Sequence, residues 1–363
     1  MREAVVAPAK RNPETDAGYA VARLRGMRSH LFEQSLYERL IAAPDMGAVV
    51  KELMETAYAP DLESELVHGR TSAVVDEALK DNMVRAYRKV LSFLDPRARK
   101  LLSTLLGRWD VFNIKTILRG AHSQVPFEEI RASLLPAGYL GTTELEALAR
   151  IEDVRAIIDT MAMWKLVYAA PLRQAYPEYS NDGRLVPLEL AIDRQYAEWA
   201  AERLVGETDD VVAARRVLGT QVDTLNLVTV LRMIKEEVGA ENAARYYLAG
   251  GRVIRPEQYA SLARLSDVDE LLDALKSTPY GPALDQVATR YLEKQSIAVF
   301  ERALEELLML RALGSGIRDP HGVGVAIAYL WGKQNEVTNV RIIVQGKEVG
   351  MPSERVREAL ILV

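Results

Sequence analysis

The segment DVFNIKTILR, residues 110–119, recurs twice in this chain in altered form, as DTLNLVTVLR at residues 223–232 and EVTNVRIIVQ at residues 336–345. The asparagine of each copy lies 113 residues from that of the next, at positions Asn113, Asn226 and Asn339. Three such periods account for 339 of the 363 residues, so nearly all of the chain is predicted to be one unit used three times. Because the period is well above the roughly 20–50 residues of solenoid repeats, each unit is predicted to be a small domain.

Further landmarks keep this register. Each unit has an aspartate five residues after a leucine, and later a tyrosine followed four residues on by a leucine. The three tyrosines mark turns in the predicted repeats and are Tyr58, Tyr168 and Tyr280. We therefore divide the chain into a mobile N-terminal extension and three helical repeats, at residues 1–18, 19–137, 138–250 and 251–363.

Helical periodicity runs through almost every segment, and hairpin signals are missing from the sequence. Only 5 Phe and 4 Trp accompany many aliphatic residues, which is typical of helix-on-helix packing. The predicted fold class is all-α, with three similar helical lobes produced by an internal triplication. We also predict one long helix from about Leu284 to Leu313, and a third signature helix that opens with Asp319 as its N-cap.

The composition excludes several classes of protein. A formal charge of −5 argues against a broad nucleic-acid surface, which needs a concentrated basic excess. With no cysteine there is neither a disulfide framework nor a thiolate site. The longest apolar stretch of note, residues 323–331, is far shorter than the ~20 residues that span a bilayer. We do not expect an integral membrane protein.

Within each signature the acid, the asparagine three residues on and the apolar residues at plus four and plus seven share one helix face. The acid and the asparagine should therefore be buried, and buried polar groups need hydrogen-bond partners. The predicted network contains Asp110, Asn113, Arg119, Asp223, Asn226, Arg232, Glu336, Asn339 and Arg341. The third copy departs from the others because it has Gln345 in place of the arginine. We favour a structural network that locks the helices in register, and a network that also contacts a partner stays open.

No residue pattern calls for a catalytic, cofactor-binding or metal site. The four histidines, His30, His68, His122 and His321, lack the spacing of metal ligands. Adjacent acids such as Asp209 and Asp210 could hold Mg²⁺ in an all-α lyase, but on helices rich in Lys and Arg such pairs are usually solvated. We expect no cofactor and no catalytic residue.

The combination of these motifs resembles the C subunit of the A/V-type rotary ATPases, the homologue of the d subunit of eukaryotic V-type ATPases. The likeness rests on the opening from Tyr19 to Leu62, on the three signatures and on the closing segment from Glu336 to Leu360. It extends from about residue 17 to 363, so the N-terminal extension lies outside it. The resemblance implies a pseudo-threefold funnel of three helical lobes.

The resemblance also implies a role in ion transport. In this family the protein is a non-catalytic rotor piece of the central stalk, a socket that joins the membrane proteolipid ring to the central shaft, which is made of the D and F subunits. It would be peripheral, on the cytoplasmic face of the membrane, in one copy per complex, and would transmit torque that couples ATP turnover to proton or sodium transport without binding nucleotide. The alternatives are a free-standing helical-repeat adaptor for protein–protein interaction and an all-α enzyme that uses acid clusters.

Overall fold

The computed structural model describes residues 13–68, 71–237 and 239–362, and no β-strand occurs in these ranges, which confirms the all-α prediction. Of the predicted extension, residues 1–12 lie outside the described ranges, and residues 13–18 belong to the first helix. In the described part of the chain, no helix combines the length and the apolar character needed to cross a bilayer.

The helices follow one another without long gaps. Those before residue 95 are α1 (Pro13–Arg28), α2 (Gln34–Ala42), α3 (Met46–Met54), α4 (Ala59–Glu65), the 3-10 turn η1 (Leu66–His68) and α5 (Ser72–Phe93). Those up to residue 203 are α6 (Pro96–Leu106), α7 (Arg108–His122), α8 (Phe127–Ser133), α9 (Thr142–Ala149), α10 (Val154–Met163), α11 (Ala169–Asp182) and α12 (Val186–Arg203). The rest are α13 (Asp209–Lys235), η2 (Ala240–Tyr246), α14 (Pro256–Leu262), α15 (Val268–Leu275), α16 (Gly281–Asp285), α17 (Ala288–Lys294), α18 (Ala298–Leu313), α19 (Ser315–Arg318), α20 (Val323–Glu348) and α21 (Ser353–Ala359).

One type of N-cap starts the same short helix in each predicted unit. The side chains of Asp45, Asp153 and Asp267 each accept a hydrogen bond from the backbone N–H three residues later, at 2.7–2.9 Å. This is the usual way to satisfy one of the free N–H groups at a helix start. The aspartates that marked the sequence register therefore begin α3, α10 and α15.

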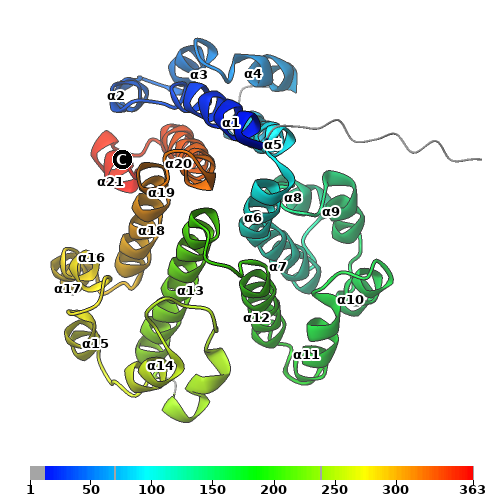
Figure 1. Cartoon of the computed structure of the whole chain (residues 1–363), viewed down its shortest axis with the longest axis vertical. Coiled ribbons are helices and arrows are strands. Elements are labelled where there is room, and N and C mark those ends of the chain that lie inside the picture. The colour runs from blue at the N-terminus through cyan, green and yellow to red at the C-terminus, as the bar shows by residue number, and fades with distance from the viewer. Residues whose placement is uncertain (1–12, 69–70, 238, 363) are drawn as a thin grey trace, which may run out of the picture.

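Figure 1 shows the helices gathered in three groups, and each group contains one signature helix, α7, α13 or α20. Each signature helix packs against a long helix, in the pairs α7 with α12, α13 with α18, and α20 with α5. The short helices lie on the outside of these pairs. At the centre α6, α13 and α20 pack on one another.

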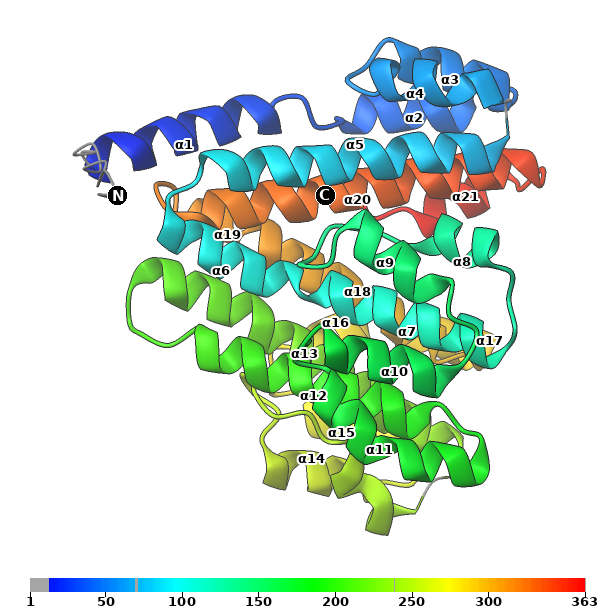
Figure 2. The same cartoon turned by 90° about the vertical axis from the view of Figure 1, so that its right-hand side faces the viewer.

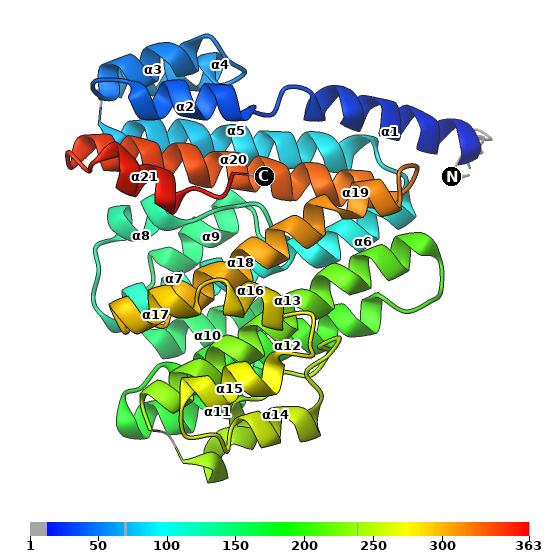
Figure 3. The ribbon, with the colours of Figure 1, turned by 90° about the vertical axis from the view of Figure 1, so that its left-hand side faces the viewer.

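The groups do not follow the predicted units from end to end. The signature helix α7 packs against α9 and α10, and α13 against α14, so each contacts short helices of the following unit. The last signature helix, α20, packs against α2 and α3 at the other end of the chain. Figures 2 and 3 show α20 lying beside α5, with α21 next to it. The last two helices of the chain, α20 and α21, thus complete the group that contains the N-terminal helices.

Two local predictions are wrong. The segment from Leu284 to Leu313 is not one helix but is divided among three. The helix α16 ends at Asp285, and Gln295, which adopts a left-handed backbone conformation, ends α17. The third signature helix begins at Val323 rather than after Asp319. Its first N–H donates to the carboxylate of Asp210 from another helix, at 2.7 Å, and Asp319 accepts from Gly324 at 2.9 Å. A tertiary contact therefore supplies one of the caps that the local sequence was expected to provide.

Candidate functional site

The three signature asparagines form the same pair of hydrogen bonds. In each case the side-chain amide donates to the carbonyl of the residue 22 positions later and accepts from the N–H of that same residue, at 2.6–3.0 Å. The pairs are Asn113 with Leu135, Asn226 with Leu248, and Asn339 with Ile361. All three asparagines are buried, as the helix-face argument predicts. Each pair, called here an asparagine clamp, fixes the segment that follows a signature helix.

The first two acids bind the backbone of the loop that enters the next group. Asp110 accepts from the N–H groups of Tyr139 and Leu140 at 2.9 Å, and Asp223 accepts from those of residues 252, 253 and 254 at 2.9–3.0 Å. A glycine precedes these donors in both loops, and a Cβ at Gly138 or Gly251 would collide with the carboxylate. Burial raises the pKa of Asp110 to about 6, although the two N–H donors act against the shift.

The third acid, Glu336, joins the C-terminal part of the chain to the N-terminal part. Glu336 accepts from the N–H of Phe32 at 2.6 Å, from the hydroxyl of Tyr58 at 2.7 Å and from the ammonium of Lys333 at 2.8 Å. Phe32 and Tyr58 are 304 and 278 residues away in sequence. Burial lowers the pKa of Lys333, and burial together with the charge of Glu336 raises that of Tyr58. The C-terminal signature helix therefore holds the N-terminal segment, as the earlier acids hold the loops that follow them.

The turn tyrosines lie against these acids. Tyr280 donates to Asp223 at 2.7 Å, as Tyr58 does to Glu336. Tyr168 is buried near Asp110, and its pKa is raised first by burial and then by the charge of that carboxylate. Each predicted unit thus contributes its tyrosine to the acid of the unit before it, and the first unit contributes to the last.

The arginines of the signatures lie on the outer side and reach the paired long helix. Arg119 contacts Glu189 through two hydrogen bonds of 2.6 and 2.7 Å, and Arg232 contacts Glu301 at 2.8 and 3.0 Å. In the third copy, where Gln345 replaces the arginine, Arg341 contacts Asp76 at 2.6 Å. The three acceptors are spaced 113 and 112 residues apart, so Arg341, one helical turn earlier, serves an equivalent acid.

Comparison with known proteins decides the family. The model of the ATP synthase (C/AC39) subunit family matches residues 20–359. The chain belongs to this family. Similar relatives include the C subunit of the A-type ATP synthase of Halorubrum lacusprofundi, 28% identical over 97% of this chain and 98% of the relative. The same subunit of Methanobrevibacter smithii is 30% identical over 94% of this chain and 86% of the relative. The resemblance found in the sequence is confirmed.

The network of this family member contains two kinds of residue that were not predicted from the sequence. The acids Asp76, Glu189 and Glu301 repeat at nearly the same period as the asparagines, and this spacing could have revealed them. Lys333 could not have been found in this way, because the equivalent positions hold Gly107 and Thr220. It pairs with Glu336 only in the third signature, where both side chains are almost wholly buried.

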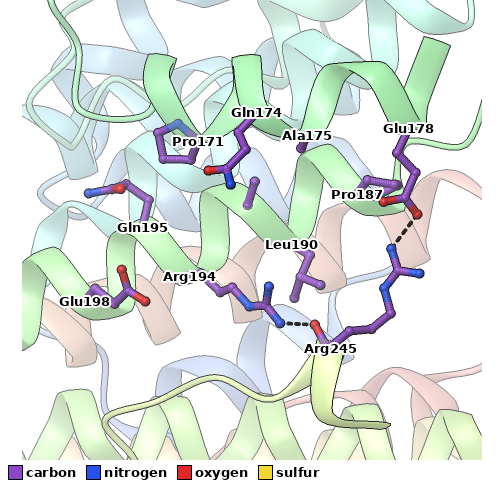
Figure 4. A pocket seen from close by; sticks show the side chains of 11 residues that line it. Pro171, Gln174, Ala175, Glu178, Pro187, Leu190, Arg194, Gln195, Glu198 and Arg245 are labelled. Carbon is purple, nitrogen blue, oxygen red and sulfur yellow. Dashed lines mark hydrogen bonds and ion pairs between the residues drawn. The ribbon is translucent and has the colours of Figure 1, made fainter. Parts of the chain in front are cut away.

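The chain of this C/AC39-family protein also has a cavity of about 410 Å³ between α11, α12 and η2. Figure 4 shows two contacts of its charged side chains: Arg245 pairs with Glu178, and Arg194 donates to the backbone carbonyl of Arg245. These contacts tie the helix group that contains α7 to the group that contains α13. Within the described ranges, no three histidine or carboxylate side chains are placed to share a metal ion.

Proposed function

We propose that this chain is the non-catalytic coupling subunit of a rotary ATP synthase, joining the membrane proteolipid ring to the central shaft made of the D and F subunits. It would sit on the cytoplasmic face of the membrane as a peripheral, single-copy part of the rotor. The proposal includes a threefold arrangement of similar lobes that receives the shaft. Family membership supports the assignment to the complex, and the buried network supports the mechanical role.

The observation that carries the mechanical role is the closure of the chain through Glu336. Three sequence repeats joined only by the covalent chain would form an open series, in which the first and last repeats could separate. Here the last signature helix binds the N–H of Phe32 and the hydroxyl of Tyr58. A force that would separate the first repeat from the last is then opposed by buried contacts as well as by the connecting segments.

Buried polar contacts suit this purpose because they are costly to break. A buried hydrogen-bonding group left without a partner loses about 1–3 kcal/mol. Each asparagine clamp supplies two such bonds, and each acid supplies two or more. Small displacements of a loop relative to its signature helix therefore meet a steep penalty, whereas apolar contacts alone would allow sliding. Stiffness of this kind is what transmission of torque requires.

Copurification tests the proposed assembly. The chain would be tagged at its N-terminus, because Ile361 near the other end is bound by Asn339 and a tag there could disturb the clamp. Membranes of the host would be solubilised in mild detergent, and the companions of the chain identified by mass spectrometry. Recovery of proteolipid and central-shaft subunits is expected. Recovery of the chain alone, from the soluble fraction, would contradict the proposal and favour the free-standing adaptor.

The coupling role has a separate test. Asn226→Leu removes the clamp in the middle of the chain, and we expect ATP hydrolysis by the assembled complex in vesicles to continue with less ion transport per ATP. The matched control is Asn181→Leu on the exposed surface of α11. Equal transport per ATP in both variants, with the Asn226 variant still assembled, would show that this clamp has no part in coupling.

A further inference from the structure

Four arginines surround a pocket of about 470 Å³ at the side of the helix group that contains α13. Arg215 and Arg216 come from α13, and Arg252 and Arg255 from the loop that leads into α14. All four are exposed, and no carboxylate or aromatic side chain is among the described residues that line the pocket. The cavity in Figure 4 differs in this respect, because Glu178 and Glu198 line it together with its arginines. This second pocket, called here the arginine pocket, concentrates positive charge on a chain whose net charge is −5.

The buried network holds the arginine pocket in shape. The backbone N–H of Arg252 donates to Asp223 at 3.0 Å, which fixes the start of the loop on α13. The aliphatic part of the Arg252 side chain then lies directly over Gly219, where even a Cβ would collide with it. Gly219 is one helical turn after Arg215 and Arg216, so these side chains share the region of α13 that Arg252 covers. The arginines converge because the backbone beneath them is fixed.

The arginine pocket is not part of the repeated architecture. One period before Arg215 and Arg216 the chain has Leu102 and Ser103, and one period after them it has Ala328 and Tyr329. Leu102, Ala328 and Tyr329 are buried, whereas both arginines are exposed. Arg215 donates to the carbonyl of Gly206 at 3.1 Å, whereas the Arg216 side chain makes no hydrogen bond or ion pair with the described residues. The repeated fold therefore does not account for the pair.

The arginines repel one another unless an anion lies between them. The only carboxylate within ion-pair distance of the four, among the described residues, is that of Glu207, which lies 3.5 Å from Arg215 and is itself largely exposed. Such an exposed pair contributes little. Guanidinium groups bind carboxylates and phosphates alike through paired N–H donors, but a phosphate monoester brings a charge of about −1.5 to −2 where a carboxylate brings −1.

We propose that the arginine pocket binds a ligand that carries two phosphate groups. A phosphate monoester has a charge of about −1.5 to −2 near neutral pH, so two such groups come close to balancing the four arginines. Because none of the described residues that line the pocket is aromatic, the pocket binds phosphate groups and offers no stacking surface to a nucleotide base. The ligand is either a soluble diphosphate or a lipid headgroup with two phosphodiesters. Both present two sets of phosphate oxygens to the guanidinium groups, and each phosphodiester carries one negative charge. This site is independent of the coupling function proposed above.

Calorimetric titration of the full chain with inorganic pyrophosphate tests the proposal. We expect one saturable site per chain whose affinity falls as salt is added. In the double variant Arg216→Gln and Arg252→Gln, affinity is expected to fall roughly a hundredfold, since each charge-assisted contact is worth about tenfold. The control is Arg264→Gln with Arg290→Gln, two exposed arginines outside the pocket, and it should bind like the wild type. Far-UV circular dichroism checks that both variants are folded.

Sedimentation with phosphatidylcholine vesicles that contain cardiolipin separates the two sources of phosphate. Vesicle binding that pyrophosphate displaces, and that the pocket variant lacks, would support the proposal and identify a lipid headgroup. Pyrophosphate binding without vesicle binding would support it and identify a soluble diphosphate. The proposal is overturned if pyrophosphate does not saturate a site or binds the pocket variant unchanged. It is also overturned if only poly-glutamate binds through these arginines, because the ligand would then be an acidic protein segment.

Discussion

Replacing Asn226 by leucine isolates the contribution of one asparagine clamp to stability. Asn226 is fully buried, and its amide both donates to the carbonyl of Leu248, at 2.8 Å, and accepts from the N–H of the same residue, at 2.9 Å. Leucine has the same number of side-chain heavy atoms as asparagine, branched at the same carbon, so the main effect is to leave two buried backbone groups without partners. At about 1–3 kcal/mol for each group, the expected loss in the free energy of unfolding is about 4 kcal/mol.

Urea unfolding followed by far-UV circular dichroism measures this loss. Asn181→Leu is the control for a change of the same type at an exposed position, and it should alter the free energy of unfolding by less than about 0.5 kcal/mol. Asn226→Asp provides a second comparison, because it keeps the shape and one acceptor but removes the donor to the Leu248 carbonyl. We expect the free energy of unfolding of this variant to fall by at least the contribution of the bond to the Leu248 carbonyl, about 2 kcal/mol.

Two outcomes would refute this expectation. If Asn226→Leu lost no more stability than Asn181→Leu, with the dependence on urea unchanged, the two buried hydrogen bonds would contribute nothing net. The repeated asparagine would then owe its place to something other than stability. If instead Asn226→Asp matched the wild type while Asn226→Leu did not, the N–H of Leu248 alone would account for the clamp, and the bond to the Leu248 carbonyl would contribute nothing.

Three further predictions concern the acids. Tyr280→Phe removes one donor to Asp223 but leaves its three backbone donors, so urea unfolding is expected to show a loss of about 1–2 kcal/mol, and no loss would contradict the role of the hydroxyl. The raised pKa of Asp110, about 6, means that the folded chain holds this proton more tightly than the unfolded chain, whose value is near 4. This stabilisation is present below about pH 4 and is lost as pH rises through 6, so stability relative to Asp110→Asn is expected to fall by roughly 3 kcal/mol between pH 4 and 7, and a flat difference would refute the shift. Lys333→Met leaves Glu336 buried without its cation and is expected to cost about 3–5 kcal/mol in urea unfolding at pH 7, most of which a second change, Glu336→Gln, restores. A double variant no more stable than Lys333→Met would mean that the buried charge is not the cause.

Local sequence contained enough information to predict which residues of the signature are buried. An acid, an amide three positions on and apolar residues at plus four and plus seven must share a helix face, whatever packs on it, and Asp110 and Asn113 are indeed buried. The all-α class followed from the same periodicity. The same periodicity wrongly predicted one long helix from Leu284 to Leu313. The spacing of apolar residues does not reveal a single residue with a left-handed backbone, such as Gln295.

The partners of the buried groups depended on the tertiary structure. The sequence showed that Glu336 needed a hydrogen-bond donor, but only the fold brought Phe32 and Tyr58 to it from about 300 residues away. It likewise showed that the third signature lacks an arginine at position 345, but not that Arg341 reaches Asp76 from the preceding turn. The reason is physical. Helical period determines which face of a segment avoids water, whereas the identity of the group that meets that face depends on the path of the whole chain.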